Sequence, residues 1–102
     1  MTLQDVKGKV AFYGAAAVKK QFEIEYEFCK GKMLENDVSI DSVESLPDAQ
    51  RNESDRLVIA ELRKASESFL LRMDNAKKHQ AMVPEAEKLI EAEAIAEKVK
   101  TA

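Results

Sequence analysis

The sequence predicts a mainly α-helical protein that folds as a single small domain. The chain has 102 residues, of which 45% are hydrophobic and 34% are charged, an ordinary composition for a globular domain. Apolar residues recur every three or four positions through most of the second half, as on one face of a helix. Two prolines divide the chain, residues 1–102, into an N-terminal segment (1–46), a long helix (47–83) and a C-terminal helix (84–102).

The N-terminal segment fits either a helix or a short β-hairpin. Thr2 and Asp5 resemble a capping box at a helix start, and Gly31 suits the position just after a helix end. Residues 22–28, however, read FEIEYEF, an alternation of apolar and acidic side chains that is typical of a strand. Both structures stay open for residues 21–29, so an α+β fold is the alternative fold class.

The long helix is the clearest element, because an apolar stripe runs along it opposite charged residues. The stripe consists of Val58, Leu62, Ala65, Phe69, Met73 and Ala76, and it is widened by Ile59, Ser66 and Leu70. Pro47 and the acidic residue after it favour a helix start there. A helix over 48–80 would be about 50 Å long, whereas a compact protein of this size has a radius of gyration of about 13 Å. We therefore expect this helix to bend, break or contact another chain.

The C-terminal helix is predicted from Pro84, the acidic residues after it and a narrow apolar face. This face consists of Leu89, Ala92, Ala96 and Val99. Alanine and glutamate dominate the segment, and both residue types favour helices. Because a short helix with such a narrow face is only marginally stable in water, we expect it to dock on the long helix or on another chain.

Residues that could carry out catalysis are few. The chain has one cysteine, Cys29, and one histidine, His79, which lie far apart in the sequence. Cys29 is expected to be buried among aromatic residues, and His79 is expected near a helix end, where the helix dipole favours a charged imidazole. No spacing typical of a zinc, calcium or phosphate-binding site occurs. We therefore expect a protein that is not an enzyme, with no catalytic, cofactor-binding or metal-binding residues.

The net charge and the length of the apolar segments indicate which classes of partner to expect. The net charge is −3, the wrong sign for a protein that binds phosphate backbones through lysine and arginine. The longest apolar stretch, residues 10–18, is much shorter than the roughly 20 residues that span a membrane. A lone cysteine and an N-terminus without an apolar signal sequence favour a cytoplasmic location. The expected partners are therefore proteins, and neither nucleic acid nor a membrane is expected.

Acidic residues are concentrated in the middle of the chain. They include Glu23, Glu25, Glu27, Glu35, Asp37, Asp41 and Glu44. If residues 21–29 form a strand, the first three carboxylates line one face about 7 Å apart, which is close to the spacing of phosphates along a nucleic acid. Such a face could bind a basic surface, because opposite charges steer and orient the encounter.

Two functions fit these observations. The favoured interpretation is a non-enzymatic interaction module, a small helical accessory or assembly protein that forms a homo-oligomer. Aromatic residues commonly anchor interfaces, so the expected anchors are Tyr13, Phe22, Tyr26 and Phe69. The alternative is an acidic inhibitor or adaptor that binds a basic surface of a larger machine, such as one that handles nucleic acid, through residues 23–48.

Replacing Phe69 by aspartate tests whether this side chain belongs to the core. Phe69→Asp places a charge on the apolar stripe and is expected to unfold part of the chain, because burying an unpaired carboxylate is unfavourable. Circular dichroism should show a lower helix content than in the unaltered chain. An unchanged helix content would contradict the assignment, since an interface residue altered in this way should only dissociate an assembly.

Overall fold

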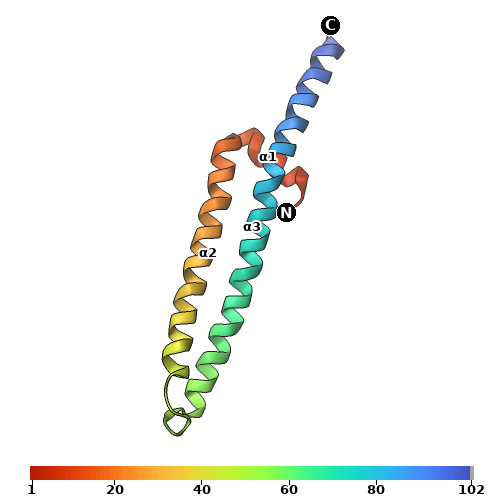
Figure 1. Ribbon diagram of the computed structural model, residues 1–102. Coiled ribbons are helices and arrows are strands. Elements are labelled where there is room, and N and C mark those ends of the chain that lie inside the picture. Colours follow the sequence, from red (N-terminus) through yellow and green to blue (C-terminus); the bar gives the residue numbers. More distant parts are fainter. Residues whose placement is uncertain (102) are drawn as a thin grey trace. The chain divides into compact units, whose positions relative to one another are not determined.

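The computed structural model describes residues 1–101, which form three α-helices and one short 3₁₀ turn (Figure 1). The helices are α1 (Leu3–Tyr13), α2 (Ala15–Glu44) and α3 (Glu53–Thr101), and the turn η1 (Asp48–Gln50) lies between α2 and α3. The described residues contain no strand, so the mainly α prediction is confirmed. Residues 21–29 belong to α2 rather than to a hairpin, because Phe22, Tyr26 and Cys29 also repeat at helical spacing.

Helix α1 is bounded by two local signals. Thr2 and Asp5 form the predicted capping box: the Thr2 backbone N–H donates to Asp5 Oδ2 (2.8 Å), and the Asp5 N–H donates to Thr2 Oγ1 (3.3 Å). At the other end Gly14 has a φ of 90°, which glycine adopts without steric cost. Gly31, predicted to end a helix, instead lies inside α2, which continues to Glu44.

Helix α3 begins and ends later than the sequence predicted. Residues 48–50 form η1, and α3 starts after Asn52, whose side chain accepts from the Asp55 N–H (2.9 Å). Pro84 lies inside α3, so residues 84–101 continue the long helix instead of forming the separate helix that we expected over 84–102. A proline inside a helix costs about 3 kcal/mol, but its neighbours Val83 and Ala86 are fully buried and hold this turn in place.

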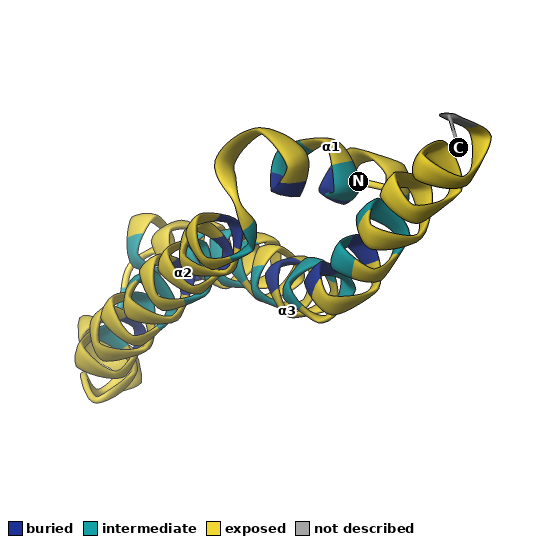
Figure 2. Ribbon diagram, turned by 90° about the horizontal axis from the view of Figure 1, so that it is seen from above, coloured by how far each residue is buried: buried dark blue, intermediate teal, exposed yellow. Residues whose placement is uncertain are grey.

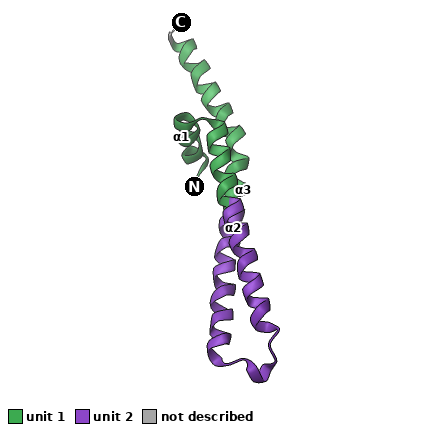
Figure 3. Ribbon diagram, turned by 90° about the vertical axis from the view of Figure 1, so that its left-hand side faces the viewer, with its two compact units in different colours: residues 1–25, 75–102 green, residues 26–74 purple. Residues whose placement is uncertain are grey.

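The chain divides into two compact units, which we describe separately (Figure 3). Unit 1 comprises residues 1–25 and 75–102, and unit 2 comprises residues 26–74. Helices α2 and α3 contribute to both units, whereas α1 belongs to unit 1 alone. The expectation of a single domain stays a prediction.

Unit 1 has a small apolar core to which all three helices contribute (Figure 2). The buried residues are Val6, Val10, Val18, Phe22, Val83 and Ala86. Burying one valine side chain contributes about 1.5–3 kcal/mol, so this cluster holds α1 onto the other two helices. At its edge, the Lys7 ammonium forms an ion pair with Glu93 of α3.

In unit 2, α2 and α3 lie side by side as an antiparallel pair (Figure 1). Cys29 and Ile40 of α2 and Ile59 of α3 are buried there. Between the two helices the Asn36 side-chain amide donates to Ser66 Oγ (3.2 Å). This part of the chain therefore combines a thin apolar seam with polar contacts across it.

The buried stripe of α3 begins one residue later than the sequence predicted. Val58 is half exposed, and Ile59 is buried in its place. From residue 58 to residue 73 the buried and half-buried positions are Ile59, Leu62, Ala65, Ser66, Phe69 and Met73. Apart from Ala65, they follow one another at spacings of three and four residues, as in a coiled-coil seam, and Ile59 rather than Val58 continues this spacing.

Two glycine-to-alanine substitutions test the backbone of α1 and α2. Gly14→Ala places a side chain at a φ of 90° and is expected to lower the free energy of unfolding by about 1–3 kcal/mol. Gly31→Ala adds the same methyl group to a helical residue with no atom within 4 Å of it, and is expected to raise that free energy by about 0.5–1 kcal/mol. Chemical denaturation measures both changes. Equal effects of the two substitutions would contradict the helix boundary at Gly14.

Candidate functional site

The described titratable residues do not assemble into a metal-binding cluster. Among them, no three histidine, cysteine, aspartate or glutamate residues converge as ligands. Cys29 is fully buried in α2, in agreement with the expectation for a small apolar side chain. Within the part of the chain that the structure describes, no helix has the length and apolar content needed to cross a membrane.

His79 lies in the middle of α3 and not at a helix end, because the helix continues past Pro84. Its ring packs against Phe22, with the ring centroids 5.4 Å apart. Partial burial lowers the pKa of His79, because the charged imidazolium loses water there, and the positive amino terminus lowers this pKa further. His79 thus contributes to the packing of unit 1 as a neutral ring.

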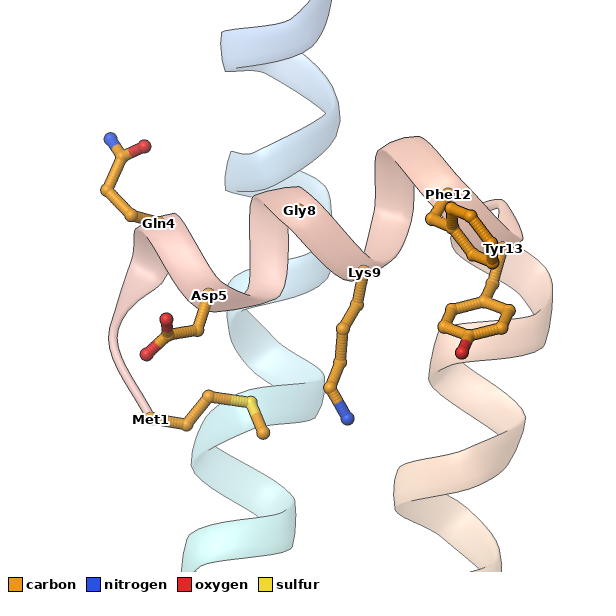
Figure 4. A pocket seen from close by; sticks show the side chains of 7 residues that line it. All are labelled: Met1, Gln4, Asp5, Gly8, Lys9, Phe12 and Tyr13. Atoms are coloured by element: carbon orange, nitrogen blue, oxygen red, sulfur yellow. The ribbon is translucent and has the colours of Figure 1, made fainter.

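An apolar hollow lies on the outer side of α1, in unit 1 (Figure 4). It is lined by Met1, Gln4, Asp5, Gly8, Lys9, Phe12 and Tyr13. The Phe12 side chain is 81% exposed, and its ring meets the Tyr13 ring edge-on with centroids 4.7 Å apart. Apart from the backbone of α1 itself and the two chain neighbours of Gly8, no atom lies within 4 Å of the place where a Cβ of Gly8 would be. Because the lining comes from α1 and the residues just before it, the hollow can contact a protein surface but cannot enclose a small substrate.

A second open surface of unit 1 is the end of α3, residues 91–100, which we call the tail. Every residue of the tail is exposed (Figure 2). Its apolar residues are Ala92, Ala94, Ile95, Ala96 and Val99. Since successive helical residues are rotated by about 100°, all of these except Ala94 lie on the side of α3 opposite to buried Val83 and Ala86. The tail therefore carries an apolar side that no described residue of unit 1 covers.

The four predicted anchors differ in their surroundings. Phe22 is buried in the core of unit 1, so its ring packs against residues of its own chain. Tyr26 and Phe69 are half-buried, and the Phe69 ring lies 6.4 Å from that of Phe28. Tyr13 is exposed and is therefore the anchor with the most surface for a partner. The anchor role of all four stays a prediction.

The sequence alone did not indicate Phe12 and Ile95 as surface residues. Phe12 lies in an apolar pattern that resembles a core stripe, and the signal that separates it from Phe22 is Gly14, which ends α1 between them. Ile95 lies beside the predicted face of the C-terminal helix, and only the packing of α1 shows which side of α3 is covered.

The acidic residues of α2 do not form the row expected of a strand. Because helical residues are rotated by about 100° each, Glu25 lies on a different side of α2 from Glu23 and Glu27. Three acids form ion pairs: Glu23 with Lys20 (3.6 Å), Glu35 with Lys32 (3.4 Å) and Glu44 with Arg63. Asp37 and Asp41 line a surface hollow of unit 2. The predicted match to phosphate spacing is therefore wrong.

Stability is expected to depend on pH through His79. Its pKa in the folded chain is below the ordinary value of 6.5, so the unfolded chain binds the proton more readily. The stabilising contribution of the neutral ring is therefore complete above pH 6.5 and is lost as the pH falls from 6.5 through the folded-state pKa.

In His79→Gln the new side chain cannot be protonated in this pH range. The stability of this variant is therefore expected to lack the decrease in acid that His79 causes. Chemical denaturation at pH values on both sides of 6.5 measures it. The same loss of stability in acid for both chains would contradict the assignment to His79.

No protein-family model matches this chain, and no curated protein or solved structure shows significant similarity to it.

Proposed function

We propose that the chain is a non-enzymatic protein–protein interaction module that associates with further copies of itself. The observation that carries this proposal is the balance of exposed and buried apolar side chains. Among the described residues fourteen large apolar side chains are exposed, whereas ten apolar residues are buried. Scattered surface hydrophobics are normal, but here several lie together on two open surfaces of one unit, the hollow of α1 and the tail.

The exposed fractions of the apolar side chains on these two surfaces support the same proposal. Phe12 and Tyr13 of the hollow are 81% and 55% exposed, and Ile95 and Val99 of the tail are 63% and 71% exposed. A second copy offers the simplest way to cover such surface, because one patch then serves both sides of a twofold interface.

The competing proposal is the acidic inhibitor or adaptor that binds a basic surface of a larger machine. The acids of α2 lie on several sides of the helix, and three of them form ion pairs within the chain. These two observations favour self-association over the acidic alternative.

Light scattering on a gel-filtration column, over a range of protein concentrations and at low and high salt, tests the proposal. A mass that is a multiple of 11.4 kDa and persists at high salt is expected, because apolar contacts are not screened. A monomer at every concentration and salt would contradict self-association. An assembly that forms only with an added basic protein and dissociates in salt would support the acidic alternative instead.

A further inference from the structure

We infer that the tail, residues 91–100, pairs with the tail of a second copy of this chain in antiparallel orientation. This inference rests on the proposed self-association and names the surface that carries it.

The side chains of the tail are exposed in unit 1. All ten residues from 91 to 100 are exposed, whereas the turns of α3 just before them contain the fully buried Val83 and Ala86. The tail continues α3 and so needs no helix nucleation of its own, but its exposed apolar residues add little burial to stabilise it. Contact with a second chain would supply the burial that the tail lacks in unit 1.

The apolar side of the tail combines the small residues Ala92 and Ala96 with Ile95 and Val99, which are 63% and 71% exposed. Small side chains let two helix backbones approach closely, and Ile95 and Val99 then fill the space beside them. This side is opposite to the face that packs in unit 1, so a partner can reach it without displacing α1.

Charged residues lie on both flanks of this apolar side. One flank carries Glu91 and, two turns later, Lys98; the other carries Glu93 and, two turns later, Lys100. In an antiparallel pair each flank meets the same flank of its partner in reverse order, which brings each glutamate near a lysine. A parallel pair would instead bring Glu91 near Glu93 of the other copy. The charges therefore favour the antiparallel orientation.

The pair is expected to be modest in strength. The tail is short, so it covers less than the about 800 Å² per partner of a standard interface, and Glu93 also forms its ion pair with Lys7. We therefore expect a dimer that dissociates on dilution, closed by a twofold axis near residues 95 and 96.

A charge exchange within one flank tests the orientation. Glu91→Lys alone and Lys98→Glu alone each place like charges together, and each is expected to raise the dimer dissociation constant about tenfold at low salt. The double variant E91K/K98E, and an equal mixture of the two single variants, are expected to recover the original dissociation constant. Sedimentation equilibrium at low salt measures all five samples, including the unaltered chain.

A matched pair of apolar substitutions tests the surface itself. Ile95→Asp is expected to abolish the dimer, whereas Leu71→Asp, at a residue of unit 2 with the same exposed fraction of 63%, is expected to leave it intact. Circular dichroism confirms that both chains remain helical. Monomers of the unaltered chain at all concentrations would overturn the proposed function and the tail contact together.

If instead the unaltered chain is a dimer and Ile95→Asp dimerises equally well, the self-association stands and only the tail contact is overturned. Dimers that lose affinity in Ile95→Asp but do not recover in the charge exchange would overturn the antiparallel orientation.

Discussion

The packing of α1 onto α2 and α3 in unit 1 is the interaction on which the other features depend. Val6 and Val10 of α1 are buried with Val18 and Phe22 of α2 and with Val83 of α3. This contact is possible because Gly14, at a φ of 90°, lets the chain change direction between α1 and α2. This packing buries one side of α1 and one side of α3. The apolar side chains on the remaining sides of these two helices therefore stay exposed.

The continuity of α3 through Pro84 follows from the same core. A proline removes a backbone donor and would commonly end a helix. Here buried Val83 and Ala86 flank it, so the packing of unit 1 offsets the lost hydrogen bond. One consequence is that residues 91–100 extend beyond the buried core as a helix whose apolar side is exposed in unit 1. The proposed pairing of two tails would bury this exposed apolar side.

Local signals in the sequence predicted the helices well, whereas their limits and exposed faces depended on long-range packing. The capping box of Thr2 and Asp5 and the helical spacing around Phe69 were both readable from neighbouring residues. Pro84 was misread because its effect depends on burial of the residues around it, and the alternation at residues 22–28 fits helix and strand equally until a partner is known. The exposure of Phe12 and Ile95 could not be predicted, because it depends on which side of α1 and α3 the core uses.

Hydrogen exchange along α3, measured on dilute and on concentrated protein, tests the central claim most directly. The account predicts slow exchange of the amides around Val83 and Ala86 at both concentrations, since the core of one chain protects them. Amides of residues 91–100 should exchange fast in the dilute sample and slowly in the concentrated one, where a second copy covers them. Equal protection of this segment at both concentrations, or fast exchange in a sample shown to be a dimer, would contradict the account.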